Sequence, residues 1–199
     1  MLKRAFDIFF AAGALLVLAP LLIVVALWVK FDSSGPVFFR QPRVGLRGCM
    51  FAIYKFRTMR VDTRADGPQI TVGTDPRITP SGAFLRKYKI DEFPQFINVV
   101  LGDMSVVGPR PEVARYVALY PGATRELVLS VRPGITDLAS IEYRDENDLL
   151  GRSADPETTY VTEVMPAKLA YCERYVRERS FIGDLAIIRR SFMASFARR

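Results

Sequence analysis

The stretch IFFAAGALLVLAPLLIVVALWV, residues 8–29, contains 22 residues without a charge. Lys3 and Arg4 precede it, and Lys30 follows it. A straight helix of this length would extend about 33 Å, which is enough to cross the hydrocarbon core of a bilayer. The run is too long for a secretory signal peptide, and no small-residue cleavage site follows it. The sequence therefore predicts a membrane-inserted helix in the N-terminal region.

Pro20 lies near the middle of this run and removes one backbone hydrogen bond of the helix. A kinked helix that crosses the membrane is one interpretation, since proline helices do span bilayers. In the other, the helix breaks at Ala19-Pro20 and both ends return to one side. The two arms would be about 18 and 14 Å long, too short to cross, and positive residues flank both ends. We therefore favour a re-entrant helix–break–helix over residues 1–30 and a separate domain over residues 31–199.

Basic residues gather at both ends of the chain. Residues 1–60 carry a net charge of +7 and the last 11 residues one of +4, whereas residues 61–188 carry −4. This distribution fits two termini that lie against an anionic phospholipid surface. A nucleic-acid-binding face would instead spread positive charge over a domain. We expect membrane phospholipid, and no nucleic acid, among the partners.

The chain contains no histidine. Histidine general bases, histidine-ligated zinc and Ser-His triads are therefore excluded. Cys49 and Cys172 are far apart and lack a CxxC spacing, so the sequence indicates neither a zinc site nor a disulfide framework. What remains is carboxylate, lysine, arginine and tyrosine chemistry, together with a hard metal ion such as Mg²⁺.

The part of the chain beyond the apolar run has the pattern of a mainly helical α+β domain. Two short runs, residues 36–39 and 50–54, flank the turn-rich segment 43–48 and predict a small β-hairpin. Helices are expected over residues 81–89, 93–100, 112–120 and 166–177, separated by connections rich in proline and glycine.

A further helix is expected over residues 181–196, where apolar residues recur at helical spacing beside Arg189 and Arg190. Such a pattern is typical of an amphipathic helix in the membrane interface. A terminal helix packed on the core gives the same pattern and remains the alternative.

The segment KYKIDEFPQ, residues 87–95, places Asp91 and Glu92 beside two lysines. Pro94 suits the first turn of a helix, and the apolar residues after it would bury that helix. Neighbouring residues on a helix point about 100° apart. We therefore expect separate tasks for the two carboxylates, one at a metal ion or phosphorus and the other in proton transfer. A solvated pair that stabilises the helix N-terminus is the alternative.

Three arginines lie at defined points of the backbone. Arg57 closes the predicted hairpin, Arg110 lies between Pro109 and Pro111, and Arg132 precedes another proline. Arginine forks bind phosphate oxygens in a bidentate manner, and a diphosphate substrate would need several of them. For each arginine taken singly, a surface salt bridge is the alternative.

The motifs together resemble the bacterial sugar transferase family, in its monotopic phosphoglycosyl transferase type, which begins lipid-linked glycan assembly. They cover residues 3 to 145 in order, and the length of the chain resembles the minimal members that consist of the catalytic unit alone. The segments that carry the resemblance are KRAFD (3–7), PVFFRQ (36–41), RVG (43–45), YKFRTM (54–59), DPRIT (75–79), IDEFPQ (90–95), Asn98, GDMSVVGPRPE (102–112) and RPGIT (132–136).

The resemblance implies a reaction in two steps, with Mg²⁺ as cofactor. Asp91 attacks the β-phosphorus of a UDP-sugar and releases UMP. The phosphosugar then passes to polyprenyl (undecaprenyl) phosphate, which gives polyprenyl-diphosphate-sugar. Glu92 assists as a metal ligand, together with Asp91, or as a proton acceptor. The residues assigned to substrate binding are Lys55, Arg57, Arg86, Arg110, Arg132 and Thr136.

The resemblance also implies a location. It places a re-entrant membrane helix around Ala19 and Pro20 and a catalytic domain, residues 31–199, at the cytoplasmic face of the bacterial inner membrane. A homodimer is also compatible with the resemblance.

The sequence departs from the common family pattern in three places. The helix break is Ala19-Pro20 instead of Ser-Pro. The common Thr-Gly-Leu/Trp-Ala-Gln is TDLAS, residues 136–140, followed by IEYRDEN, a region that we assign to sugar or nucleotide selection. Cys172 stands where an aspartate is common.

Two other functions use the same features. A metal-dependent lipid-phosphate hydrolase would use the same carboxylates with water as the acceptor. A non-enzymatic adaptor at the membrane surface would bind anionic lipid through its basic ends and dock partners on its body.

Overall fold

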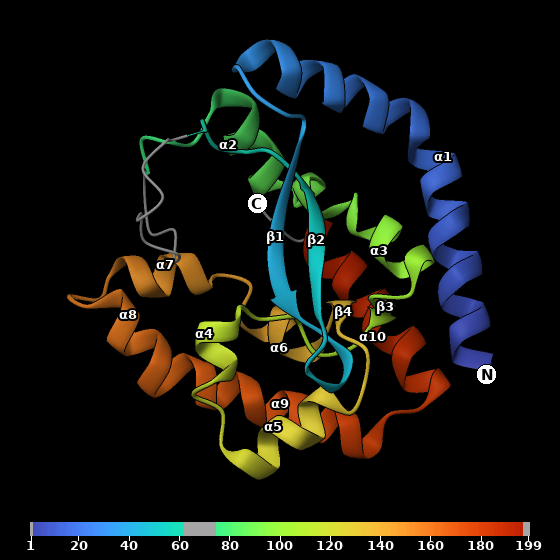
Figure 1. The fold of residues 1–199 in the computed structure, drawn as a ribbon, viewed down its shortest axis with the longest axis vertical. Coiled ribbons are helices and arrows are strands. Elements are labelled where there is room, and N and C mark those ends of the chain that lie inside the picture. Colours follow the sequence, from blue (N-terminus) through green and yellow to red (C-terminus); the bar gives the residue numbers. More distant parts are fainter. Residues whose placement is uncertain (1, 62–74, 197–199) are drawn as a thin grey trace.

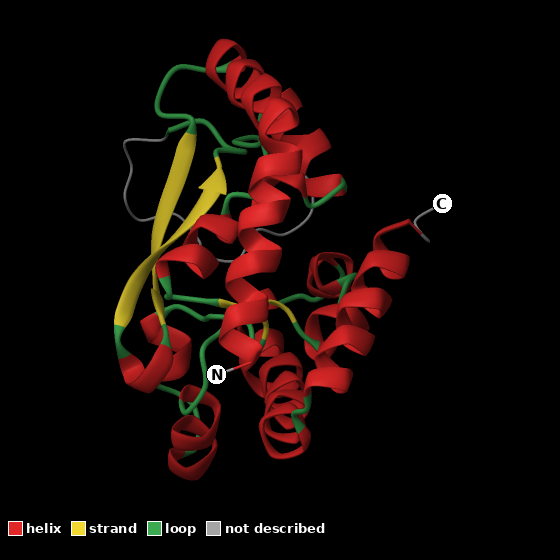
Figure 2. Ribbon diagram, turned by 90° about the vertical axis from the view of Figure 1, so that its right-hand side faces the viewer, coloured by secondary structure: helices red, strands yellow, loops and turns green. Residues whose placement is uncertain are grey.

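The computed structural model describes residues 2–61 and 75–196. It is a mainly helical α+β fold, as the sequence predicts (Figures 1 and 2). Its described part has two small two-stranded sheets, of which the sequence predicted one, the hairpin. The elements are, in chain order, α1 (Leu2–Asp32), β1 (Phe38–Val44), η1 (Leu46–Gly48), β2 (Met50–Phe56), α2 (Pro80–Lys87), η2 (Ile90–Glu92), α3 (Gln95–Leu101), β3 (Ser105–Val107), α4 (Ala114–Val117), α5 (Gly122–Leu129), β4 (Gly134–Thr136), α6 (Leu138–Glu142), α7 (Glu146–Gly151), α8 (Pro156–Thr159), the π-helical η3 (Tyr160–Val164), α9 (Met165–Glu178) and α10 (Phe181–Phe196).

Helix α1 is long and apolar enough to cross a membrane, by length and composition. It continues through Pro20 as one helix, where the sequence led us to expect a helix, a break and a second helix. The helix bends about half-way along its length, from one edge of the molecule over its top (Figure 1). Proline causes such bends because it removes a hydrogen bond and crowds the preceding turn. The re-entrant topology remains a prediction.

The first turns of α1 are fixed to the body by charged side chains. The Asp7 carboxylate is buried and accepts hydrogen bonds from the Val106 backbone N–H, at 3.1 Å, and from the Ser105 hydroxyl, at 2.8 Å. The Lys3 ammonium lies 2.5 Å from the buried Asp184 carboxylate of α10. These contacts join α1 to β3 and to the last helix.

The last turn of α1 is held by Arg57, which follows strand β2. Its buried guanidinium donates to the Val29 carbonyl at 3.0 Å, to the Ser33 carbonyl at 2.6 Å and to the Pro36 carbonyl. Helices leave their last carbonyls without intrahelical partners, so an arginine there satisfies several acceptors at once. Arg57 thereby joins the membrane-type helix to the hairpin.

The predicted hairpin is confirmed, and it is longer than expected. Strands β1 and β2 pair antiparallel from Phe38 opposite Phe56 to Val44 opposite Met50. Residues 43 and 44, expected in the turn, belong to β1, and the turn itself contains the short helix η1. The second sheet pairs β3 with β4 in parallel, which brings residues 105–107 beside residues 134–136.

The predicted helices are present with shifted ends. Residues 81–89 and 93–100 correspond to α2 and α3, residues 166–177 lie within α9, and the helix expected over residues 112–120 is the short α4. Helix α10 packs on the core through Ile187, which is 6% exposed, while Ile182 on the same helix is 79% exposed. Both sides of α10 are therefore partly apolar, and its place in a membrane interface remains a prediction.

Replacing Arg57 by alanine should lower the free energy of unfolding by about 3 kcal/mol, because several buried carbonyls lose a charged donor. Thermal or urea unfolding in detergent measures this loss. Arg152→Ala is the matched control, since Arg152 is exposed. A loss in Arg57→Ala no larger than in the control would contradict the role of Arg57 as the connection between α1 and β2.

Candidate active site

A cavity of about 300 Å³ lies where the hairpin, η2, the loop before α4 and helices α6, α7 and α9 meet. Among the described residues that line it, seven side chains are cationic and four are anionic. The cationic ones are Arg43, Lys55, Arg86, Lys89, Arg110, Arg144 and Lys168, and the anionic ones are Asp91, Glu92, Glu112 and Glu146. This excess of positive charge suits an anionic ligand such as a diphosphate.

The two adjacent carboxylates lie on η2, a single 3-10 turn between α2 and α3. Lys89, just before this turn, has a φ of 55° in the left-handed region, which redirects the chain after α2. Pro94 follows in a helical conformation, and α3 begins at the next residue. The sequence placed the pair at the start of the second helix, whereas the structure gives the pair a turn of its own.

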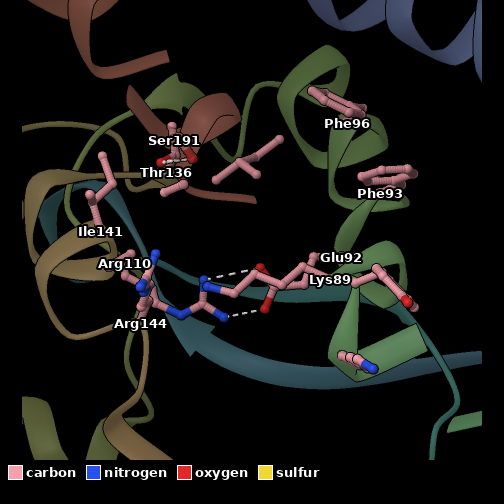
Figure 3. A pocket seen from close by; sticks show the side chains of 14 residues that line it. Lys89, Glu92, Phe93, Phe96, Arg110, Thr136, Ile141, Arg144 and Ser191 are labelled. Atoms are coloured by element: carbon pink, nitrogen blue, oxygen red, sulfur yellow. Dashed lines mark hydrogen bonds and ion pairs between the residues drawn. The ribbon is translucent and has the colours of Figure 1, made fainter. Parts of the chain in front are cut away.

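The Glu92 carboxylate is held by two cations, Arg110 and Lys55. Arg110 binds both of its oxygens, with one N–H···O distance of 3.1 Å, and the Lys55 ammonium lies 2.8 Å from Oε1. Figure 3 shows the paired contacts between Arg110 and Glu92 across the site. Burial raises the pKa of Glu92, but the charges of Arg110 and Lys55 outweigh it and hold the pKa well below its ordinary value. Glu92 is therefore an anion fixed in place.

The neighbouring Asp91 carboxylate has a different environment. It is 8% exposed and lines the cavity, and no hydrogen bond or ion pair joins its side chain to another residue in the described part of the chain. Burial first, and then the charge of Glu92, raise the pKa of Asp91 to about 6, against the opposing charges of Lys55, Arg86 and Arg110. A buried carboxylate with unoccupied oxygens, surrounded by cations, is suited to attack an electrophile or to bind a metal ion.

A second, mostly apolar cavity of about 160 Å³ adjoins the first. Figure 3 shows the side chains that line it. The two cavities share Lys89, Glu92, Arg110, Ser140 and Arg144 in their walls. The apolar cavity, which we call the α3–α10 groove, is otherwise lined by Lys87, Tyr88, Phe93, Phe96, Ile135, Thr136, Ile141, Ser191 and Ala194. Its apolar walls therefore lead directly to the ion pair between Arg110 and Glu92.

Most of the predicted site residues come together. Lys55, Arg86 and Arg110 line the cationic cavity with the two carboxylates. Thr136 lines the α3–α10 groove, where its hydroxyl lies 2.9 Å from that of Ser191. The sequence supplied these residues from separate motifs, and the folded chain collects them within two adjoining cavities.

Two predicted substrate-binding residues lie elsewhere. Arg57 is engaged with the end of α1, as described above, and lines neither cavity. Arg132 donates from Nε to the Gly102 carbonyl, at 2.8 Å, just after α3, and lines neither cavity. Both arginines satisfy carbonyls at helix ends, a role that a sequence motif does not distinguish from phosphate binding.

Several cavity residues were not assigned to substrate binding from the sequence. Lys89 and Arg144 line both cavities, and Arg43 and Lys168 line the cationic one. The position of Lys89 two residues before Asp91 was a usable signal, and Arg144 lies in the segment assigned to sugar or nucleotide selection. Nothing in the local sequence points to Lys168, because α9 reaches the cavity only through tertiary packing.

The carboxylates fit Mg²⁺ in the way that this ion is usually held beside a substrate. Mg²⁺ takes one or two carboxylates, water and substrate phosphates instead of a protein cage. Asp91 and Glu92 supply two carboxylates on one cavity wall, and the described residues contain no cluster of three His, Cys, Asp or Glu side chains. Since Glu92 already has two cationic partners, Asp91 is the carboxylate with oxygens available.

Comparison with known proteins assigns the chain to a family. The family model described as "Bacterial sugar transferase" matches residues 1–198. The chain belongs to this family. The predicted transferase activity is confirmed by that membership, and the resemblance inferred from the motifs was correct.

The relatives named here are an exopolysaccharide production protein and two undecaprenyl-phosphate sugar-phosphate transferases. The exopolysaccharide production protein PSS of Rhizobium leguminosarum bv. phaseoli is 43% identical, over 94% of this chain and 92% of that protein. The UDP-glucose:undecaprenyl-phosphate glucose-1-phosphate transferase of Escherichia coli (strain K12) is 39% identical, over 94% of this chain and 39% of that protein. A UDP-N-acetylgalactosamine-undecaprenyl-phosphate N-acetylgalactosaminephosphotransferase of Aeromonas hydrophila is 36% identical, over 94% of this chain and 42% of that protein. The chain thus spans less than half of these last two proteins.

Replacing Glu92 by glutamine should lower the turnover of the transferase reaction by about 100-fold or more, because Arg110 and Lys55 lose the anion that holds them in place. The matched control is Glu146→Gln, which neutralises another carboxylate of the same cavity whose partner is Lys168. Its turnover should stay within about threefold of the unmodified chain. Steady-state rates of both variants measure the difference, and equal losses would contradict a special role for Glu92.

Proposed function

We propose that the chain transfers a sugar 1-phosphate from a UDP-sugar to undecaprenyl phosphate through a phosphosugar intermediate on Asp91. The observation that carries this proposal is the contrast between adjacent carboxylates. Glu92 is occupied by Arg110 and Lys55, whereas the Asp91 oxygens are unpartnered among the described residues and face a cationic cavity. The relatives' names support the donor and acceptor classes.

In the first step, the donor diphosphate lies among Lys55, Arg86, Lys89 and Arg110. An Asp91 carboxylate oxygen attacks the β-phosphorus, and the bond between this phosphorus and the bridging oxygen breaks, so that UMP leaves with the bond's electron pair. The cations stabilise the charge that develops on the phosphoryl oxygens and reduce repulsion between the nucleophile and the donor. When held by Asp91 and Glu92 together with the donor phosphates, Mg²⁺ would supply further charge neutralisation.

In the second step, an oxygen of undecaprenyl phosphate attacks the same phosphorus and the Asp91 carboxylate is released. The product is undecaprenyl-diphosphate-sugar, and the free carboxylate is restored. Splitting the transfer through a covalent carboxylate lets two phosphate substrates use the same cations in turn. The cavity therefore needs only one set of anion-binding side chains.

The α3–α10 groove suits the acceptor lipid. Its walls are mostly apolar, and it opens onto Arg110, Lys89 and Arg144, which also line the cationic cavity. A polyprenyl phosphate needs this combination, with an apolar track for the chain and cations for the phosphate. We accordingly place the body at the cytoplasmic face of the bacterial inner membrane, with α1 as its re-entrant membrane element.

The test uses purified chain with Mg²⁺, a panel of UDP-sugars that includes UDP-glucose and UDP-N-acetylgalactosamine, and undecaprenyl phosphate present or absent. Sustained UMP release should require the lipid and should fall at least about 1,000-fold in Asp91→Asn, which removes the nucleophile. Asp148→Asn is the control, because Asp148 is exposed. Sustained UMP release without lipid would instead indicate a hydrolase, and full activity in Asp91→Asn would refute the mechanism.

The acceptor assignment has its own test in Ala194→Trp, which would fill part of the α3–α10 groove. The KM for undecaprenyl phosphate should rise about tenfold or more, because a large side chain excludes the lipid chain. The amount of UMP released in the first turnover without acceptor should not change. Ile182→Trp, on the same helix but away from both cavities, is the control. An unchanged KM for undecaprenyl phosphate in Ala194→Trp would contradict the assignment of the lipid to the α3–α10 groove.

A further inference from the structure

Asp137 is a buried carboxylate that lines neither cavity, but each of its oxygens accepts a hydrogen bond from a residue that lines both. It is 2% exposed and lies just before α6. Its Oδ1 accepts a hydrogen bond from the Ser140 backbone N–H at 2.6 Å, which caps the N-terminus of α6. Its Oδ2 accepts one from the Arg110 backbone N–H at 3.2 Å. One side chain thus joins α6 to the loop that carries Arg110.

The rest of this loop is fixed by backbone contacts to the segment before α6. Gly108 donates to the Thr136 carbonyl at 3.1 Å, and Gly134 donates to the Pro109 carbonyl at 2.9 Å. The two glycines approach so closely that a Cβ on Gly134 would lie 2.1 Å from the Gly108 nitrogen. These contacts therefore fix the position of the backbone as far as Pro109. The hydrogen bond to Asp137 fixes the backbone at the next residue, Arg110.

The position of Arg110 matters because its guanidinium binds both oxygens of Glu92 and lines both cavities. A small rotation of the backbone at Arg110 would move the end of this long side chain by a much larger distance. Ser140, the other partner of Asp137, also lines both cavities. The two hydrogen bonds of Asp137 thus end on residues of the shared wall.

Cys172 of α9 also lies against the Asp137 carboxylate. The Cys172 thiol of α9 lies 3.9 Å from Oδ2, and burial, followed by the charge of Asp137, raises the pKa of Cys172, so that the thiol stays neutral. Asp137 therefore accepts from two backbone N–H groups beside a neutral thiol.

We infer that Asp137 is a positioning residue of the transfer reaction, which orients Arg110 toward Glu92 while it caps α6. The inference rests on the proposed function, since it concerns the same site. The Asp137 side chain then has two roles, a structural one through Ser140 and a positioning one through Arg110. Serine at this position separates them experimentally, because a serine hydroxyl can cap α6 but offers no second oxygen to Arg110.

The test measures Asp137→Ser alone and together with Arg110→Lys, in a double-mutant cycle. In Asp137→Ser, kcat should fall about tenfold or more, because a misplaced Arg110 loses its alignment with the reacting groups. The KM for the donor should change less than about threefold, since Lys55, Arg86 and Lys89 remain. The melting temperature should stay close to that of the unmodified chain. In the Arg110→Lys variant, the additional change Asp137→Ser should lower kcat by less than about twofold.

Two results would overturn the inference: a kcat in Asp137→Ser equal to that of the unmodified chain, and losses that multiply fully in the double variant. Should Asp137→Ser fold poorly, Asp137→Asn gives the same decision. Asparagine keeps the size and one acceptor oxygen, while its amide NH₂ cannot accept from the second N–H. Lack of UMP release by the unmodified chain itself would count against the proposed function, so the two failures are distinguishable.

Discussion

The arrangement of this site depends on the contacts of Glu92 with Arg110 and Lys55. A buried carboxylate is costly unless charged donors surround it. Two cations satisfy Glu92, and both belong to segments remote from it in the sequence. This pairing leaves the adjacent Asp91 buried, near the same cations and without a partner in the described chain. Two neighbouring carboxylates thereby have different environments, and the roles proposed for them, a nucleophile and a supporting anion, require such a difference.

The fold places these groups by joining distant segments at a few polar points. Asp7 fixes the start of α1 to β3, and Arg57 fixes its end to the hairpin strand that carries Lys55. Parallel pairing of β3 and β4 brings the loop that carries Arg110 against the segment before α6. There the Asp137 carboxylate accepts a hydrogen bond from the Arg110 backbone N–H. The two ends of the apolar helix α1 thus hold the elements from which the site is built.

The sequence predicted the mainly helical fold and the hairpin, because hydrophobic periodicity and turn chemistry determine these. The separate tasks of Asp91 and Glu92 stay a prediction, and the two carboxylates have different partners in the structure. The sequence assigned Arg57 to substrate binding, whereas in the structure Arg57 binds carbonyls at the end of α1 and lines neither cavity. The local sequence does not distinguish an arginine that binds helix-end carbonyls from one that binds phosphate. Two of the three departures from the family pattern, the segment 136–140 that contains Asp137 and the residue Cys172, were not related to each other at the sequence level. In the folded chain these two side chains are in contact. Tertiary packing brings them together, and no local rule contains that information.

The most direct measurement of the central claim is the intact mass of the chain after incubation with Mg²⁺ and its UDP-sugar in the absence of acceptor. A covalent mechanism predicts a mass increase equal to one sugar phosphate, located by peptide mapping on Asp91 and removed by added undecaprenyl phosphate. The same incubation should leave Glu92 unmodified, because Arg110 and Lys55 occupy its oxygens. A chain that transfers sugar phosphate to the lipid with no adduct at any time, or with the adduct on another residue, would contradict the account.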